Sequence, residues 1–195
     1  EILAFTDSDC IPYQDWLEQA VKPLVNGEQR IAGKVELFYQ SNQLTLAEKY
    51  EKAFSFNQEN NAKNGKSVTA NMVTWKENFN QVGLFNDALM SGGDMEWGER
   101  ATEKELGIVY APSACVKHPA RYQIKDLLQK RKRVKITRSN LLVLLVRGII
   151  PPIIAYIKIY NRQDLSFLDK IKVVFLLYWL KLCGTLHNLF FKRKT

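Results

Sequence analysis

The sequence predicts an α/β layer fold followed by apolar helices, and three observations carry this prediction. Strand-like runs alternate with helical patterns over residues 1–111. Residues 1–116 hold 10 Lys and Arg against 17 Asp and Glu, whereas residues 117–140 hold 9 against 1 and residues 141–195 hold 9 against 2. Two long apolar runs, 141–157 and 173–191, come last. Because 46% of the 195 residues are hydrophobic, disorder and low complexity are excluded.

The expected elements follow one another in a simple order. The apolar residues 1–6 read as a buried strand, and a helix over 16–25 follows from the spacing of Trp16, Ala20 and Leu24, with a stop at Asn26–Gly27. Such a strand needs partners on both sides, so we expect the chain to be part of a longer protein.

The remaining elements are read in the same way. Loose alternation predicts strands over 31–38 and 68–75, and the helical spacing of Leu46, Ala47, Tyr50 and Phe54 predicts a helix over 43–62. A polar linker is expected over 57–66, a short helix over 76–82, a helix over 95–106, and a last strand over 108–111, before Pro112.

The division of charge and hydropathy predicts three regions: an α/β domain over 1–120, a basic linker helix over 121–140, and membrane-associated apolar helices over 141–195. Each apolar run is marginal as a bilayer span, because Arg147 and the Pro151–Pro152 pair interrupt the first and Lys181 the second. We expect helices in the membrane interface. True spans and ordinary core helices are the alternatives for the apolar runs, and a solvated helix is the alternative for the basic region.

The three cysteines, Cys10, Cys115 and Cys183, are odd in number and have no CxxC spacing. They indicate neither a disulfide framework nor a zinc ribbon, and they are interpreted as packing residues in a reducing compartment.

The sharpest local motif is Asp7-Ser8-Asp9, directly after the first strand. Two carboxylates one residue apart can face a common point, where a hard divalent cation takes oxygen ligands. Asp-Ser-Asp is also a common turn and helix-cap sequence, which is the alternative reading.

The second motif is SGGDMEWGER, residues 91–100, in which a glycine pair precedes Asp94 and Glu96. Both carboxylates are expected in the first turn of a helix, where the helix dipole favours negative charge. Simple N-capping by Asp94 would also satisfy this sequence.

Together and in this order, the motifs resemble the family 2 glycosyltransferases, inverting nucleotide-sugar enzymes with a GT-A fold. AFTDSDCIPYQDWL is similar to the family's DxD segment, TANMVTWKENFNQVGLFNDAL to its G-A-N stretch, with Asn71 at the Asn, and SGGDMEWGERA to its EDxDLxxR segment. The resemblance covers most of residues 1–120. It implies a Rossmann-like mixed sheet flanked by helices and truncated at its N-terminus.

The resemblance also implies roles for individual residues. Asp9, and less directly Asp7, would hold magnesium or manganese against the donor diphosphate, and Asp94 would be the general base that deprotonates the acceptor hydroxyl. Arg100 would orient or pair with a carboxylate, and Glu96 and Asn71 would line the acceptor side. A sugar would stack on Trp97, unless this ring packs in the core. In some GT-A enzymes a His near His118 completes the metal site, and a surface turn is the alternative.

Departures from the family pattern also carry expectations. Gly93 replaces the first acidic residue of the ED pair, and the QxxRW of processive synthases is absent, since residues 129–133 read QKRKR. We therefore expect one sugar, or few, to be added per encounter. The family's nucleotide-binding first half has no counterpart in this chain, so the chain alone should bind the donor poorly.

The sequence thus predicts the catalytic and C-terminal part of a glycosyltransferase at the cytoplasmic face of the cell membrane, peripheral or integral, acting on a lipid-linked or polysaccharide acceptor. The alternatives are a non-catalytic membrane adaptor with a degenerate GT-A shell and a basic nucleic-acid binder. Nucleic acid is not expected as a partner, because Tyr122 is the only aromatic residue between Lys117 and Asn140.

Overall fold

The computed structural model describes residues 1–133 and 153–191. Within them the chain forms two compact units. Residues 1–38 and 56–119 make the first unit, and residues 39–55 join the chain after residue 119 in the second. Residues 39–55, which lie in sequence within the predicted α/β domain, thus pack with the helices that follow residue 119.

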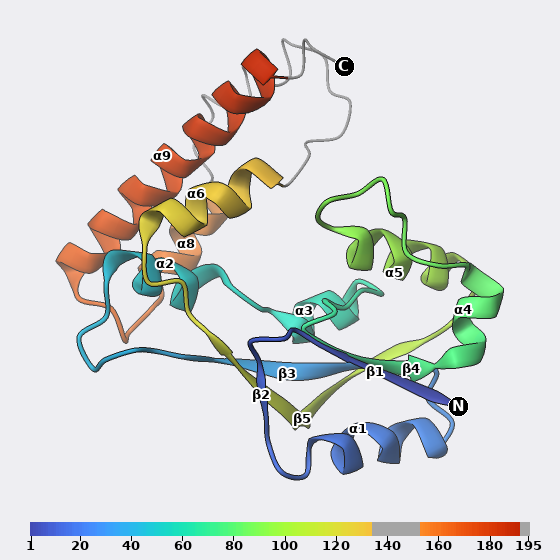
Figure 1. Ribbon diagram of the computed structural model, residues 1–195. Coiled ribbons are helices and arrows are strands. Elements are labelled where there is room, and N and C mark those ends of the chain that lie inside the picture. The colour runs from blue at the N-terminus through green and yellow to red at the C-terminus, as the bar shows by residue number, and fades with distance from the viewer. Residues whose placement is uncertain (134–152, 192–195) are drawn as a thin grey trace. The chain divides into compact units, whose positions relative to one another are not determined.

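A five-stranded mixed sheet with the strand order β1-β4-β3-β5-β2 is the base of the first unit (Figure 1). The strands are β1 (Ile2–Thr6), β2 (Ile11–Pro12), β3 (Arg30–Phe38), β4 (Asn71–Trp75) and β5 (Ile108–Pro119). β3 and β5 are parallel, and the other three pairs are antiparallel. The predicted mixed α/β fold is confirmed. Among the described residues β1 is an edge strand that pairs with β4, and it is partly exposed.

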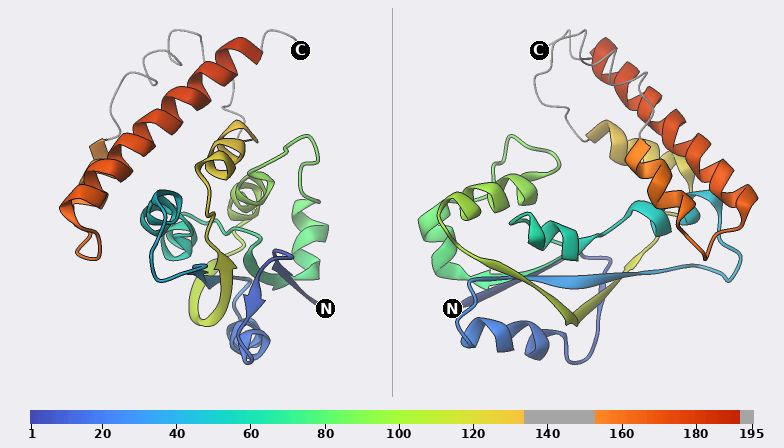
Figure 2. Two further views of the ribbon diagram at one scale, coloured as in Figure 1. Left: turned by 60° about the vertical axis from the view of Figure 1, so that its left-hand side comes forward. Right: turned by 180° about the vertical axis from the view of Figure 1, so that it is seen from behind.

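Helices cover both faces of this sheet (Figures 1 and 2). α1 (Trp16–Val25) lies on one face, and α3 (Gln58–Lys63) and α5 (Gly93–Glu103) lie on the other, while α4 (Lys76–Val82) directly follows β4. Successive side chains of β4 point to opposite faces of the sheet, so they belong to two different core clusters. Val73 packs with Trp16, Ala20 and Leu24 of α1, whereas its neighbour Met72 packs in the second cluster, whose buried members also include Phe79, Trp97, Ala101 and Leu106.

β5 extends eight residues beyond the predicted end at Ala111. Its pairing with β3 shifts between Gly33, opposite Ala111, and Lys34, opposite Cys115, so residues 112–114 bulge out of the ladder. Pro112, which has no N–H to donate, lies in this bulge, where a proline is tolerated in a strand.

The helix predicted over 43–62 is two helices, α2 (Leu46–Phe54) and α3, and the linker predicted over 57–66 is wrong because α3 lies within it. Ser55 is extended, with φ −79° and ψ 153°, and ends the first helix; Phe56 follows with a φ of 42°, in the left-handed region. Asn57 then caps α3 by accepting a hydrogen bond from the N–H of Asn60.

A buried arginine holds α5 to the sheet. Arg30 is 1% exposed and donates to the backbone carbonyls of Gly65, Gly98 and Leu106 and to the hydroxyl of Thr102. Burial lowers the pKa of Arg30 to about 10, which leaves the guanidinium charged at neutral pH. Because Gly98 and Thr102 belong to α5, this side chain fixes the helix whose first turn contains Asp94.

The second unit is helical and contains α2, α6 (Ile124–Arg133), α8 (Ile153–Tyr160) and α9 (Phe167–Phe191). One cluster joins Ala47 of α2 and Leu127 of α6 to Leu176 and Leu180 of α9. Ile159 of α8 packs with Val173 and Leu177 of α9 in a second cluster.

The second predicted apolar run lies within α9. In the described residues no helix is both long enough and apolar enough to cross a membrane. Most of the first apolar run, its Pro151–Pro152 bend, and the end of the predicted basic helix lie at 134–152, outside the described residues, as do residues 192–195.

A buried carboxylate ties α2 to the start of α6. Glu51 is 1% exposed and accepts hydrogen bonds from the Arg121 backbone N–H at 2.8 Å, the Arg121 guanidinium at 2.6 Å and the Ser55 hydroxyl at 3.0 Å. The Lys130 ammonium lies 3.7 Å away. Burial alone would raise the pKa of Glu51, but these donors and charges hold the pKa below its ordinary value.

This shift predicts acid lability in the second unit. A carboxylate with a lowered folded-state pKa contributes stability that is present above its unfolded-state pKa, about 4.3, and is lost as the pH falls through the folded value. We expect Glu51→Gln to cost about 2–3 kcal/mol at pH 7 and the difference from the parent to shrink below pH 4.3. Urea denaturation across pH 3–7 measures it.

The matched control is Glu18→Gln, since Glu18 forms an exposed i,i+4 pair with Lys22. It should change the free energy of unfolding by less than about 0.5 kcal/mol. A Glu51→Gln deficit that stays constant down to pH 3 would contradict the lowered pKa.

Candidate functional site

The predicted carboxylate pair lies in a turn at the end of β1. The Cys10 N–H donates to the Asp7 carbonyl at 3.0 Å, which closes the turn Asp7–Cys10. The Asp7 and Asp9 side chains are 44% and 57% exposed, so both carboxylates are open to solvent.

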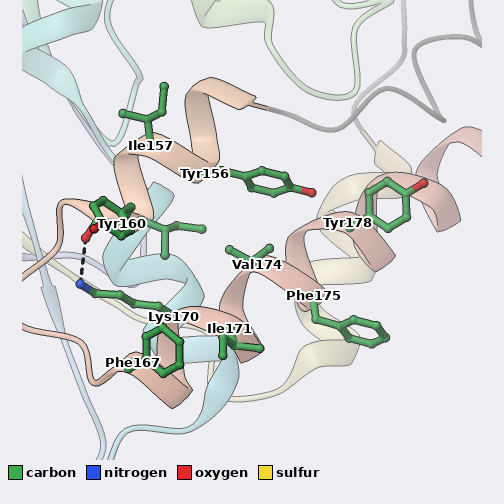
Figure 3. Close-up of a pocket in the computed structure, with 10 residues that line it drawn as sticks. Tyr156, Ile157, Tyr160, Phe167, Lys170, Ile171, Val174, Phe175 and Tyr178 are labelled. Atoms are coloured by element: carbon green, nitrogen blue, oxygen red, sulfur yellow. Dashed lines mark hydrogen bonds between the residues drawn. The ribbon is translucent and has the colours of Figure 1, made fainter.

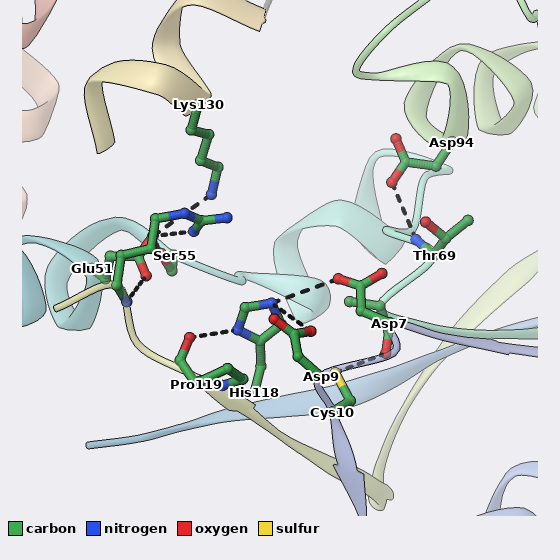
Figure 4. Close-up of polar contacts among 12 residues, drawn as sticks. Asp7, Asp9, Cys10, Glu51, Ser55, Thr69, Asp94, His118, Pro119 and Lys130 are labelled. Atoms are coloured by element: carbon green, nitrogen blue, oxygen red, sulfur yellow. Dashed lines mark hydrogen bonds and ion pairs between the residues drawn. The ribbon is translucent and has the colours of Figure 1, made fainter. Parts of the chain in front are cut away.

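His118, near the end of β5, faces these carboxylates (Figure 4). Its Nε2 lies 3.6 Å from an Asp7 oxygen and 3.8 Å from an Asp9 oxygen, and only 6% of the side chain is exposed. The Nδ1 lies 2.8 Å from the Pro119 carbonyl, and a carbonyl oxygen only accepts. Nδ1 therefore carries the proton, and in the neutral ring Nε2 turns its lone pair toward the two aspartates.

These three groups fit a divalent cation. With Cys10 they form a cluster whose ligand atoms all lie within 4.8 Å of one another. Two ligands bound to one cation at about 2.1 Å lie about 3 to 4 Å apart, and the separations of His118 from both carboxylates fall in this range. A hydrogen-bonded outer nitrogen is also the usual arrangement of a metal-binding histidine.

Cys10 is the member of this cluster that sequence reasoning missed as a site residue. Its thiol donates to the Ala70 carbonyl at 4.0 Å, and burial raises its pKa, so the protonated form is favoured. Hard cations such as magnesium and manganese prefer oxygen to sulfur. The cysteine is therefore better described as a link between the turn and the segment before β4 than as a ligand.

Asp94 lies in the first turn of α5, as predicted, and its carboxylate is fixed by two backbone groups. One oxygen accepts from the Thr69 N–H at 3.1 Å and the other from the Met95 N–H at 2.8 Å. No sequence signal pointed to Thr69, because it acts through its backbone. In Figure 4 the Asp94 carboxylate points at Thr69.

The register of the sheet brings the two motifs to the same end of β1 and β4. Thr6, the last residue of β1, pairs with Asn71, the first residue of β4. The segment before β4 therefore runs beside the turn after β1: Ala70 accepts from Cys10, and Thr69 donates to Asp94. Segments 85 residues apart in sequence thus meet at Thr69 and Ala70.

Asn71 is a completely buried structural side chain. Its Oδ1 accepts from the Trp16 indole at 2.9 Å, and its Nδ2 donates to the carbonyls of Lys34 at 2.7 Å and Ala114 at 2.9 Å. Lys34 and Ala114 stand at the β3–β5 bulge, so this amide holds the irregularity in place. All its polar atoms are used inside the protein, which leaves none for the acceptor contact that the resemblance implied.

Trp97 is also buried, with 0% exposure, and packs in the core, which was the alternative to stacking on a sugar. The ring stacks on Phe79 with centroids 4.5 Å apart, and its N–H donates to the Gly83 carbonyl at 2.8 Å. A sugar has no access to this ring in the structure.

Glu96 and Arg100 pair with each other across one turn of α5. Two guanidinium nitrogens of Arg100 contact the two Glu96 oxygens at 2.8 and 3.0 Å. Arg100 also donates to the carbonyls of Val82 and Leu84. The pair therefore anchors the start of the loop that leads from α4 to Gly92, two residues before Asp94, and Arg100 pairs with a carboxylate.

Comparison with known proteins gives one informative similarity. The chain is 36% identical over 135 residues to glycosyltransferase AglE of Haloferax volcanii, and the match covers 68% of this chain and 44% of that protein. The chain therefore spans less than half the length of this curated relative. No family model matches the chain. The similarity supports a relationship to a glycosyltransferase.

The geometry predicts that Asn71 matters first for stability. Replacing it by Ala leaves the Trp16 indole N–H and two buried carbonyls without their partner, so we expect Asn71→Ala to lower the free energy of unfolding by about 3 kcal/mol. Chemical denaturation measures it. Asn80→Ala is the matched control, because Asn80 is exposed and its amide donates to the exposed side chain of Glu77. Full stability of Asn71→Ala, with weakened acceptor binding alone, would restore the acceptor-side role.

Proposed function

We propose that this chain is the catalytic and C-terminal part of a family 2 glycosyltransferase of the GT-A type, which moves a sugar from a nucleotide-diphosphate donor to an acceptor with inversion. The observation that carries the proposal is the convergence of Asp7, Asp9 and His118 beside the segment that holds Asp94. The similarity to a glycosyltransferase supports the same reaction class.

In this proposal the donor diphosphate binds at the turn after β1. Asp9 and Asp7, with His118, would hold magnesium or manganese there, and a bound cation would neutralise the charge of the diphosphate leaving group. His118 is suited to this role by its buried ring and its fixed proton on Nδ1.

Asp94 is the general base in this proposal. Its carboxylate accepts the proton of the acceptor hydroxyl as that oxygen attacks the anomeric carbon on the face opposite the diphosphate, which inverts the configuration. The two backbone N–H groups orient the carboxylate. Arg100 and Glu96 act at a distance by anchoring the preceding loop, as positioning residues.

The acceptor we propose is a lipid-linked or polysaccharide glycan at the cytoplasmic face of the cell membrane, with residues 141–195 in contact with the membrane. The basic, apolar C-terminal part supports this, since positive charge favours an anionic surface. No observation in the described residues favours the adaptor or nucleic-acid alternatives.

The metal proposal is tested by binding manganese to the protein at its natural length, with and without a nucleoside diphosphate. We expect one manganese per chain, and Asp9→Ala should weaken its affinity at least tenfold, because the cation loses a charged oxygen ligand. His118→Gln should weaken it ~10-fold to 100-fold. Calorimetry or the manganese EPR signal reports the free ion.

Asp87→Asn is the control for charge, since Asp87 is an exposed carboxylate outside this cluster. Asp87→Asn should leave the affinity for manganese unchanged. If the parent and Asp9→Ala bind manganese with equal affinity, the metal site is wrong, and the proposed role of Asp94 is unaffected.

The base is tested by a transfer screen against a panel of nucleotide sugars. Asp94→Asn keeps an oxygen for one backbone N–H but has little basicity, so we expect turnover to fall ~10²-fold to 10⁴-fold while donor binding persists. The control is Glu103→Gln, an exposed carboxylate at the other end of α5. An unchanged turnover for Asp94→Asn would show that another group takes the proton.

A further inference from the structure

Helix α9 has two apolar faces, and only one of them packs against other described parts of the chain. Its buried face consists of Val173, Leu176, Leu177 and Leu180, which pack inside the second unit. Its exposed stripe consists of Leu168, Ile171, Phe175, Trp179 and Leu186, with Phe175 72% and Leu168 66% exposed. Spacings of three, four and seven residues place this stripe along one side of the helix. A soluble surface helix would carry polar residues there.

Helix α8 continues the same surface. Ile153, Ile157 and Tyr160 recur at intervals of four and three residues and are 64%, 57% and 78% exposed. An apolar groove of about 670 Å³ lies between α8 and α9 (Figure 3). Its lining is apolar or aromatic except for Lys170, whose ammonium donates to the Tyr160 carbonyl at 2.8 Å. A second apolar hollow on α9 includes Phe175 and Trp179, so the surface extends past the groove.

The charges on these helices are mainly positive. Residues 153–191 contain five Lys and Arg against two Asp, and both aspartates are already in ion pairs. Asp164 pairs with Lys52 and Arg162, and Asp169 pairs with Lys49. Lys158, Lys170 and Lys172 therefore lie beside the apolar stripes as excess positive charge.

We propose that the exposed faces of α8 and α9 lie flat in the outer layer of an anionic lipid bilayer, with Ile171 and Phe175 among the acyl chains and the lysines at the headgroups. Within residues 141–195, the proposal identifies the helix faces that contact the lipid. It rests on the membrane contact of the proposed function and not on the sugar-transfer chemistry. Aromatic rings and lysines beside an apolar stripe are typical of interfacial helices.

The extent and the charge of the surface favour a bilayer over other occupants. The apolar residues run along both helices, so a single hydrocarbon chain in the groove would leave the stripe on α9 open. A second copy of this chain would bring the same positive charges together, whereas anionic lipid headgroups complement them. Lysine stems cover apolar surface while their ammonium groups stay in water.

Vesicle co-sedimentation of the protein at its natural length tests the proposal. We expect binding to phosphatidylcholine vesicles with one-third phosphatidylglycerol, and at least tenfold weaker binding to phosphatidylcholine alone. Ile171→Asp combined with Phe175→Asp should weaken binding to anionic vesicles at least tenfold, because two charges would enter the acyl layer. Lys158→Glu with Lys172→Glu should remove most of the preference for anionic lipid.

The matched control is Leu17→Asp combined with Val25→Asp, two similarly exposed apolar residues on α1. It should bind vesicles like the parent. Circular dichroism shows whether each variant keeps its helices. If Ile171→Asp with Phe175→Asp binds as well as the parent, or if sedimentation without lipid shows a dimer that this variant abolishes, the proposal is overturned.

Trp179, 40% exposed on the stripe, reports the depth of insertion. The fluorescence lost in Trp179→Phe isolates its signal from Trp16, Trp75 and Trp97. Lipids brominated near the headgroup should quench it more than lipids brominated near the chain ends, and stronger quenching by the latter would overturn the flat orientation. Asp9→Ala and Asp94→Asn should bind vesicles like the parent, so a failure of the transfer chemistry is distinguishable from a failure of this proposal.

Discussion

One buried amide, the side chain of Asn71, connects the central elements of the first unit. Asn71 joins three elements at once: the indole of α1, the carbonyl of Lys34 in β3 and the carbonyl of Ala114 in β5. This arrangement requires a glycine at position 33, because a Cβ there would clash with the Asn71 amide. The irregular pairing of β3 and β5 is therefore specified by a glycine and an asparagine that fit each other.

The candidate site follows from this constraint. Since Asn71 begins β4, fixing it also fixes the segment that precedes it, and that segment receives the Cys10 thiol and donates to Asp94. Arg30 positions the helix that carries Asp94, because its hydrogen bonds to Gly98 and Thr102 set where α5 lies on the sheet. Two buried side chains that would touch no substrate thus determine where the proposed metal ligands and the proposed base meet.

Much of the fold was predictable from sequence. The first strand, α1 and the start of α5 follow from apolar spacing and glycine stops, and the aspartates were identified from their position after a strand. The predicted ends of elements were wrong where tertiary contacts, rather than local sequence, determine the backbone. Pro112 reads as the end of a strand but lies in a bulge that Asn71 supports, and the helix predicted over 43–62 is interrupted at Ser55, which adopts an extended conformation. Asn71 and Trp97 share their residue types with binding sites, and only their burial reveals their structural roles.

The chain passes between the two units three times, after residues 38, 55 and 119. The second unit is therefore not an appendage that follows a finished domain: α2 lies between β3 and β4 in sequence, yet Ala47 is buried at 1% exposure by α6 and α9, which come from after residue 120. During synthesis from the N-terminus, Glu51 of α2 leaves the ribosome 70 residues before its partner Arg121. A chain shortened at Pro119 would keep every strand of the sheet and still carry, in the middle of its sequence, an amphipathic helix whose apolar face had lost its cover.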